Sequence, residues 1–500
     1  MLLGLDLGTT NVKALVTDAA GKPLARGSCP VQLFRLPDGG VEQDINEIWR
    51  ATISAIKEAV RTVDPKDIDA IGVSSQGGAM QVLDKEGQPL GRVISWLDQR
   101  GRTFDETLTQ ELGKTWFLER IVHGGSWLSI GQVLRLRKAQ PALFDPPNRI
   151  GFVGDIIVGR LCGTAAHDGT SCALTLFYNP KARIYDPDLL KRLALLPEQM
   201  PILMPPSVPA GGLTAAISRE TGLRTETPVS PAVHDQYASA LATGATRTGT
   251  VMVGTGTAWV LLHVTDQLPR PATDQAFVCH HVIESLWGQI LSMVNGGSAL
   301  TWALELTGNA GADGKRTDDL LASAPPGSDG VVFWPFMTPF GASALAPETR
   351  GRLDGLQLHH HAAHIIRAVV EGLGCELNRY LGLLRGSGQQ VERLVMGGGA
   401  AASRVTPPML ADLTGLPLRC FAGNDASLIG AVVLARGLLE PKRSLAALAA
   451  EMSPASSEVT PGPQAAFYQE RYERYVKSLP LVQRGTTKVP IKPGSKKVPS

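Results

Sequence analysis

Residues 2–16 read LLGLDLGTTNVKALV, and residues 251–264 read VMVGTGTAWVLLHV. In each stretch an apolar run leads into a turn of Gly and Thr residues, and a second apolar run follows. This layout predicts a strand, a tight turn and a second strand, present twice in one chain. Two such hairpins facing each other would offer backbone N–H groups and small side chains, which is what a nucleotide polyphosphate needs.

The elements that follow each hairpin extend the repeat. Residues 44–60 open with an Asp cap and place apolar residues at helical spacing, and residues 68–74 return to a strand pattern. The order β-β-β-α-β begins again after residue 246, and residues 361–384 have the apolar spacing of a long, half-buried helix. The sequence therefore predicts a duplicated α/β domain with a boundary near Gly244.

Composition narrows the class of protein. The 500 residues contain 48 Lys+Arg and 46 Asp+Glu, a net charge of +2, so bulk charge indicates neither nucleic-acid nor membrane binding. The six cysteines are scattered without a C-x-x-C pair, which argues against a disulfide framework or a zinc ribbon. No secretory signal or bilayer-length apolar stretch is evident. We expect a cytoplasmic protein with no nucleic-acid or membrane partner.

Asp235 is the strongest catalytic candidate. It lies in Pro-Ala-Val-His-Asp-Gln (231–236), between a Val/Ala-rich run that predicts a buried strand and a segment that opens a helix. A carboxylate at such a corner suits a base that accepts the proton of an alcohol. Together with the two hairpins, this residue points to phosphoryl transfer.

Several motifs resemble those of one family. They are Gly351–Leu356 with His364–Glu371, Trp96–Arg100, Gly397–Ala400 and Ala426–Ala431. On these residues the chain, from Leu3 to about Gly437, resembles the FGGY carbohydrate kinase family of the actin/hexokinase/Hsp70-like superfamily, and is most similar to its xylulokinase-like members.

The resemblance implies an α/β fold of two actin-like (ribonuclease H-like) domains, each with a β-β-β-α-β-α-β-α core, around a central cleft. Residues 1–245 would form the N-terminal domain, which binds the sugar and carries the catalytic base. Residues 246–475 would form the C-terminal, nucleotide-binding domain. The lysine-rich and arginine-rich end, which contains no acid after residue 481, predicts a disordered basic tail over 476–500.

The resemblance also assigns roles to residues, with ATP and Mg²⁺ as cofactors. Asp235 would be the catalytic base and Asp6 would hold the metal, and we match Asp6 to Met252 in the second copy, so that only one hairpin carries a metal carboxylate. The residues predicted to bind the nucleotide are Thr9, Thr10, Lys13, Gly254, Thr255, Gly256, Gly398 and Gly399. Those predicted to bind the sugar or polyol are Gln76, Gly77, Trp96, Asp98, Arg100, Asp235 and Gln236.

One departure leaves the substrate open. Xylulokinases usually follow the Gln with Met-His-Gly, whereas this chain has Gln-Gly-Gly-Ala at 76–79, so an imidazole is missing. D-xylulose, giving D-xylulose 5-phosphate, is the first expectation; ribulose, another ketose, glycerol and erythritol are alternatives. An actin-like nucleotide switch without sugar transfer would explain the hairpins equally well, and a weakened, sugar-sensing member is conceivable. Family members often form homodimers, although no pattern here specifies an interface.

The histidines at 359–361 and 364 are a tempting but weaker feature. Two of them are spaced i, i+4, but no convergent acid or Cys is evident in the sequence. We therefore expect a solvated helix start and no metal. Asp155 and Asp168 are expected to cap local structure. His234, beside Asp235, could tune the base, but such a neighbour more often satisfies a backbone carbonyl, which is what we expect.

Overall fold

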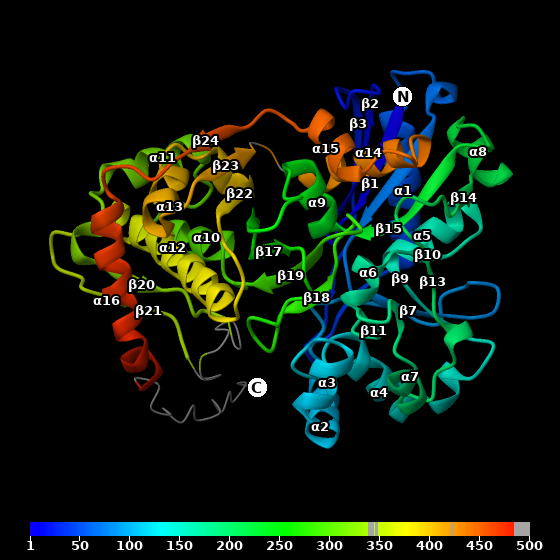
Figure 1. Cartoon of the computed structure of the whole chain (residues 1–500), viewed down its shortest axis with the longest axis horizontal. Helices are drawn as coiled ribbons and strands as arrows, with labels where there is room; N and C mark the ends of the chain where they lie inside the picture. Colours follow the sequence, from blue (N-terminus) through cyan, green and yellow to red (C-terminus); the bar gives the residue numbers. More distant parts are fainter. Residues whose placement is uncertain (339–344, 346–348, 422, 424, 485–500) are drawn as a thin grey trace, which may run out of the picture.

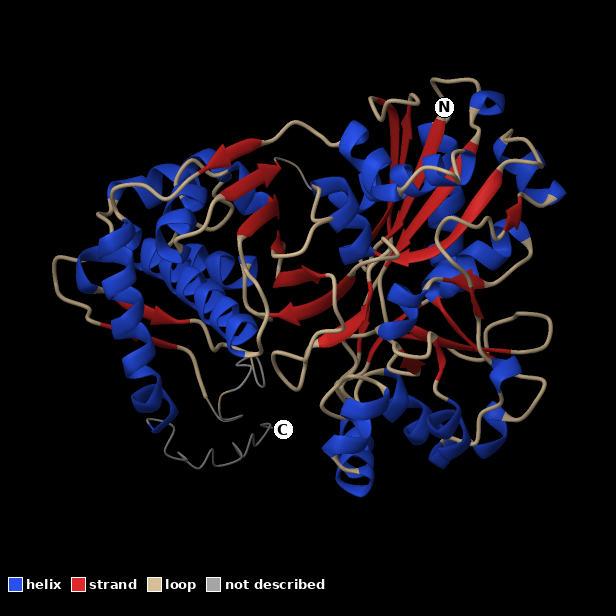
Figure 2. Ribbon diagram, in the orientation of Figure 1, coloured by secondary structure: helices blue, strands red, loops and turns tan. Residues whose placement is uncertain are grey.

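The chain forms two α/β halves that lie side by side, one built from residues before about 245 and the other mostly from residues after it (Figure 1). The computed structural model describes residues 1–338, 345, 349–421, 423 and 425–484. Figure 2 shows helices packed around the strands of each half. The predicted two-domain α/β fold is confirmed.

The N-terminal half is organised around an eight-stranded sheet. Its first strand, β1 (Leu2–Leu7), runs antiparallel to β2 (Asn11–Thr17) and parallel to β6 (Ala70–Ser75). All six residues of β6 are buried, as expected for a central strand covered on both faces. The other strands of the sheet are β3 (Pro23–Pro30), β10 (Ala166–His167), β13 (Ile202–Leu203), β14 (Gly211–Gly212) and β15 (Pro228–His234).

The C-terminal half repeats this arrangement in a seven-stranded sheet. Here β16 (Thr250–Thr255) runs antiparallel to β17 (Trp259–Thr265) and parallel to β22 (Arg393–Gly398). The remaining strands are β18 (Phe277–His280), β19 (Trp287–Ser292), β23 (Leu418–Phe421) and β24 (Ser457–Val459).

The helices complete the duplicated order. α1 (Ile45–Ala59), α5 (Val153–Cys162) and α9 (Asp235–Thr243) follow the strands of the first half. α12 (Ala362–Gly386), α13 (Thr406–Thr414) and α14 (Ala426–Leu439) do so in the second. The predicted cap of α1 is present, because the Asp44 side chain accepts the N–H of Asn46 at 2.8 Å.

Helix α14 joins the two halves. Although it comes late in the sequence, it packs on β1 and β6 of the N-terminal sheet and on α9 (Figure 1). Glycines permit this approach. A Cβ on Gly72 of β6 would lie 1.8 Å from the carbonyl oxygen of Ala431, and a Cβ on Gly430 would lie 1.9 Å from that of Ala238. The start of α14 is thereby held close to the end of β1.

Smaller elements surround the two main sheets. A five-stranded sheet supports the loop that follows Ile94, and its strands are β4 (Phe34–Arg35), β5 (Val41–Gln43), β7 (Met80–Leu83), β8 (Val93–Ile94) and β9 (Arg149–Phe152). Two short hairpins are β11 (Tyr178–Asn179) with β12 (Ile184–Tyr185), and β20 (Val332–Trp334) with β21 (Arg352–Asp354). The other helices are α2 (Arg102–Leu112), α3 (Lys114–Arg120), α4 (Ser129–Ala139), α6 (Gly169–Ala173), α7 (Pro187–Arg192), α8 (Ala215–Thr221), α10 (Gly297–Leu306), α11 (Gly314–Ser323) and α15 (Leu445–Met452).

The last helix corrects the predicted tail. α16 runs over Ala465–Arg484, so residues 476–484 continue a helix and are not part of a disordered segment. Tyr475 and Leu479 of this helix are buried, which gives the helix an apolar face that a composition argument overlooks. Residues 485–500 lie outside the described part of the chain. Among the helices that the structure describes, none is long and apolar enough to cross a membrane.

Candidate active site

The carboxylate of Asp6 lies where three distant segments meet. Its Oδ1 accepts a hydrogen bond from Ser74 at the end of β6 at 3.1 Å, and its Oδ2 accepts one from Ser427 at the start of α14 at 2.9 Å. The pKa of Asp6 is raised to about 6 by burial and then by the negative charge of Asp235, although both hydroxyls and Lys13 oppose the rise. The predicted metal carboxylate is therefore held in place but electrostatically unsatisfied.

Asp235 is the first residue of α9, directly after β15, as the sequence predicts. Burial raises the pKa of its carboxyl to about 6, while hydrogen bonds from Gln236 lower it. About a third of its side chain is exposed, so a ligand can reach it. A half-buried carboxyl with a raised pKa is what a general base working near neutral pH requires.

The surroundings of Asp6 suit a divalent cation that would link its carboxylate to a phosphate group. Asp235 raises the pKa of Asp6, which places the two negative charges near each other. Asp6 offers hard oxygen ligands in the environment that Mg²⁺ prefers, and a cation there would relieve the repulsion. The neighbourhood of Asp6 thus suits the predicted metal, with Ser74 and Ser427 orienting its oxygens.

A hydrogen-bonded network of polar side chains lies beside this pair. Thr9 donates through Oγ1 to Oε1 of Gln76 at 3.2 Å, and the indole N–H of Trp96 donates to the same hydroxyl at 3.1 Å. Gln76 in turn donates to Oε1 of Gln43 at 3.2 Å, and Gln43 donates to the backbone oxygen of Thr9 at 2.9 Å. The structure therefore brings the predicted residues Thr9, Gln76 and Trp96 together. Trp96 remains 41% exposed, so its ring is available to a ligand.

Asp98 and Arg100 are placed differently from the rest of the predicted sugar set. The Asp98 side chain has no exposed surface, and its oxygens accept from Arg100, from the backbone of Val41 at 2.8 Å and from Gln132 at 3.0 Å. Burial would raise the pKa of Asp98, but Arg100 and the backbone donors hold it below its usual value. In this geometry Asp98 and Arg100 stabilise the loop that carries Trp96. Most of their polar atoms are already paired within the protein, so few remain to bind a ligand.

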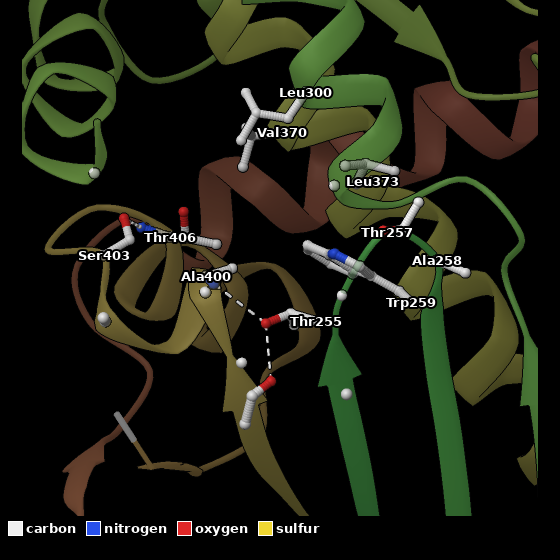
Figure 3. Close-up of a pocket in the computed structure, with 18 of the residues that line it drawn as sticks. Thr255, Thr257, Ala258, Trp259, Leu300, Val370, Leu373, Ala400, Ser403 and Thr406 are labelled. Carbon is white, nitrogen blue, oxygen red and sulfur yellow. Dashed lines mark hydrogen bonds between the residues drawn. The ribbon is translucent and has the colours of Figure 1, made fainter. Parts of the chain in front are cut away.

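A cavity of about 1260 Å³ includes Gln236, the neighbour of Asp235 in the sequence, in its wall. Figure 3 shows part of this cavity. Its wall includes five of the predicted nucleotide residues, which are Gly254, Thr255, Gly256, Gly398 and Gly399, together with Gln236 and Ser427. Apolar side chains line another part of it, among them Leu300, Val370 and Leu373. The glycine turns suit the polyphosphate of a nucleotide, and the apolar wall suits its adenine ring.

Thr255 ties the two glycine turns of this cavity together. Its hydroxyl donates to the Gly397 oxygen at 2.9 Å and accepts the N–H of Ala400 at 3.2 Å (Figure 3). Gly398 has φ +100°, and a Cβ there would lie 2.8 Å from Thr255 Oγ1, so both backbone and space demand glycine.

The predicted nucleotide residues of the first hairpin do not line this cavity. Thr9, Thr10 and Lys13 are outside the cavity wall, and Lys13 forms an ion pair with Asp425 at 3.3 Å.

Comparison with known proteins identifies the family. The N-terminal domain of the FGGY family of carbohydrate kinases matches residues 1–242, and the C-terminal domain of the same family matches residues 249–436. This chain belongs to the FGGY family of carbohydrate kinases. It is 26% identical to a xylulose kinase of Escherichia coli, over 96% of this chain and 100% of that protein. It is 28% identical to a glycerol kinase of Citrifermentans bemidjiense, over 87% and 89%.

Solved structures agree on the fold of this kinase. A gluconate kinase from Lactobacillus acidophilus superposes with a TM-score of 0.87 at 23% identity, covering 97% of this chain and 99% of that one. Relatives named for xylulose, glycerol and gluconate thus share one architecture. Membership of the family identifies a carbohydrate kinase, but it does not select the carbohydrate.

The second hairpin of this kinase lacks an acidic side chain. Leu7 of β1 pairs with Ser75, the last residue of β6, and Thr255 of β16 pairs with Gly398, the last residue of β22. Residues 250–265 contain no Asp or Glu, and Met252, the residue matched to Asp6, is buried. Of the two hairpins, only the first therefore offers a carboxylate to a metal.

The histidines before α12 need a second correction, because an acid does converge on them. His359 Nε2 lies 2.7 Å from Oδ2 of Asp329, and His360 Nε2 lies 3.1 Å from the Asp329 backbone oxygen. However, His360 Nδ1 accepts the N–H of Gln357 at 2.8 Å, so the ring proton of the neutral imidazole is on Nε2. A metal ligand needs the opposite arrangement, and we assign no metal to this cluster.

Sequence reasoning assigned no role to several residues of the site. Ser427 and Asp425 lie at the start of α14 and reach the first hairpin only because α14 packs on the N-terminal sheet. Ser74 reaches Asp6 through the pairing of β6 with β1.

Gln43 was not singled out from the sequence. It lies in β5 of the small sheet and is a completely buried polar residue that accepts a hydrogen bond from Gln76. A buried Gln is a signal that becomes visible only once burial is known.

Proposed function

We propose that this carbohydrate kinase transfers the γ-phosphoryl group of ATP to a hydroxyl group of a ketose, with D-xylulose as the first substrate and D-xylulose 5-phosphate as the product. The observation that carries the proposal is the position of Asp235. Its neighbour Gln236 lines the 1260 Å³ cavity, while the negative charge of Asp235 raises the pKa of Asp6. Thr9, Gln76 and Trp96 form a hydrogen-bonded network in the same half of the chain.

The sugar would bind to the half formed by residues 1–245, and the nucleotide mainly to residues 246–475. Gln76, Gly77, Trp96 and Gln236 would surround the acceptor, with Asp98 and Arg100 supporting Trp96. The glycine turns at 254–256 and 397–399 would receive the phosphates of ATP. Closure of the two halves would exclude water and bring the acceptor to the phosphate.

In the transfer, Asp235 accepts the proton of the acceptor hydroxyl as that oxygen attacks the γ-phosphorus. The new O–P bond forms while the bond between the γ-phosphorus and the β,γ-bridging oxygen breaks, and ADP leaves. Asp6 would hold Mg²⁺, which when bound offsets negative charge on the phosphates. Ser74 and Ser427 keep the Asp6 oxygens oriented, and the raised pKa of Asp235 matches a base that works near neutral pH.

A different polyol is the second candidate. Gly77 and Gly78 leave the wall beside Gln76 without side chains, and relatives of similar identity are named for xylulose and for glycerol. The choice between these acceptors depends on the hydroxyl pattern that the network reads.

The test is ADP release from Mg-ATP across a panel of acceptors. The panel contains D-xylulose, L-xylulose, D-ribulose, L-ribulose, L-fuculose, glycerol, erythritol and gluconate, with a control that lacks sugar. Stimulation by D-xylulose above all others supports the proposal, and stimulation by another member reassigns the substrate. A flat panel with steady background hydrolysis would contradict sugar transfer and favour a nucleotide switch.

A further inference from the structure

His234 occupies a constrained position immediately before the catalytic base. It is the last residue of β15, and only 8% of its side chain is exposed. Its Nε2 lies 3.4 Å from Oδ1 of Asp235. The other ring nitrogen, Nδ1, is buried and has no hydrogen-bond partner among the described residues. The expectation that this side chain satisfies a backbone group is therefore wrong, and the ring needs another explanation.

Hydrogen bonds to Thr170 and Asp168 hold the backbone of His234 in place. Its N–H donates to Oγ1 of Thr170 at 3.1 Å, and the Thr170 hydroxyl donates to Oδ1 of Asp168 at 2.7 Å. Asp168 also caps α6 by accepting the N–H of Ser171 at 3.0 Å, which confirms its predicted capping role. Because this chain of bonds holds the backbone, the direction of the imidazole is determined by what surrounds the ring.

Gly77 makes room for that ring. A Cβ on Gly77 would lie 2.6 Å from Cδ2 and 2.8 Å from Nε2 of His234, closer than real side chains approach. It would also lie 2.9 Å from Cβ of Leu174. Any side chain at residue 77 would therefore displace the edge of the imidazole that faces Asp235. The Gly77 that the sequence placed in the sugar site is coupled to the base through His234.

The protonation state of His234 suits a hydrogen-bond donor. Burial lowers the pKa of its imidazole to about 4, and the charge of Asp168 opposes this only in part, so the ring is neutral near pH 7. A neutral ring with its proton on Nε2 leaves only an acceptor unpartnered at Nδ1. The opposite tautomer would bury an unpartnered N–H, which costs more.

We propose that His234 is a positioning residue for Asp235, and that Gly77 is required because only glycine leaves space for the imidazole. The Nε2–H of His234 engages Oδ1 of Asp235 and thereby presents Oδ2 to the acceptor hydroxyl. A base oriented by a third group in this way is a recurring catalytic arrangement. The inference rests on the proposed function, because Asp235 must be the base for its orientation to matter.

The test begins with two substitutions at residue 234, assayed with the stimulating sugar. His234→Ala removes the donor, so we expect kcat to fall by up to about 100-fold, the cost of a misplaced group, while the KM for ATP stays within about twofold. His234→Gln keeps an N–H at similar reach and should recover most of the lost kcat. His361→Ala, which removes an exposed imidazole, is the matched control. Equal losses in the Ala and Gln variants, or a loss expressed in the KM for ATP, would overturn the positioning role.

A double-mutant cycle with Gly77→Ala tests the coupling. In the wild-type background the new methyl group displaces the imidazole, so kcat should fall by at least about tenfold. In the His234→Ala background the ring is gone and only the Leu174 contact remains, so the further loss should be much smaller. If the fold decrease in kcat of the double variant equals the product of the decreases in the two single variants, the coupling is overturned. Melting temperatures of all four proteins show whether Gly77→Ala remains folded; if it does not, restored folding in the double variant supports the contact and continued unfolding contradicts it.

Failure of this inference is distinguishable from failure of the proposed function. If no acceptor stimulates the wild-type protein, sugar transfer itself is contradicted, whatever the variants do. If the wild-type protein is stimulated and the cycle shows no coupling, the kinase assignment stands and the role of His234 falls.

Discussion

Acidification should inactivate this kinase through Asp235 at a pH well above that of an ordinary aspartate. The carboxyl is half-buried at the start of α9, and burial raises its pKa from 3.8 to about 6. A general base must be deprotonated to accept a proton, so activity is present above this pKa and is lost as the pH falls through it.

The size of the effect follows from the pKa. With a value of about 6, Asp235 is about 99% ionised at pH 8 and about 9% ionised at pH 5, so kcat/KM for the sugar falls about 11-fold. Asp6 has a similarly raised pKa, and if it also had to lose a proton unaided the fall would be about 120-fold. A cation held by Asp6 keeps that carboxylate ionised, so we expect the smaller value with saturating Mg²⁺.

The assay is the initial rate of ADP release at low sugar and saturating Mg-ATP, from pH 5 to 8 at constant ionic strength. Melting temperatures over the same range separate loss of activity from unfolding. An unshifted pKa of 3.8 would leave about 94% of Asp235 ionised at pH 5. A rate that declines by less than a tenth between pH 8 and pH 5 would therefore refute the reasoning about Asp235.

Three further substitutions test separate parts of the structure. Gly72→Ala should lower the free energy of unfolding by about 3 kcal/mol, because a methyl group would overlap a carbonyl of α14, whereas Gly386→Ala, with open space around it, should change it by less than about 1 kcal/mol in urea titrations; equal effects would contradict the tight packing. Trp96→Phe removes the indole donor to the first hairpin and should raise the KM for the sugar about fivefold; an unchanged KM would remove Trp96 from the sugar site. Ser427→Ala removes a hydrogen bond to Asp6 and should raise the Mg²⁺ concentration that gives half the maximal rate about fivefold; no change would argue against metal binding there.

The repeated hairpins and Asp235 were predictable because their signals are local. A strand, a Gly-Thr turn and a strand can be recognised in about fifteen residues, and the corner at Asp235 needs only the change from an apolar run to a helical one. The cap of α1 is equally local. These features depend little on which distant segment packs against them.

The parts that escaped prediction depend on contacts between distant segments. Ser427 reaches Asp6 across 421 residues, because glycines in β6 and α14 allow a close approach of the two backbones. The helix over 476–484 has a basic, polar composition, and only its packing reveals the buried face.

The proposed function depends most on Asp235 acting as the base for phosphoryl transfer to a sugar. The most direct measurement compares wild-type protein and Asp235→Asn in single-turnover transfer of labelled γ-phosphate from ATP to the acceptor that stimulates the wild type. We predict that the rate of transfer falls by about two to four orders of magnitude, while ATP binding measured by calorimetry is unchanged. Transfer by Asp235→Asn at the wild-type rate would contradict the account.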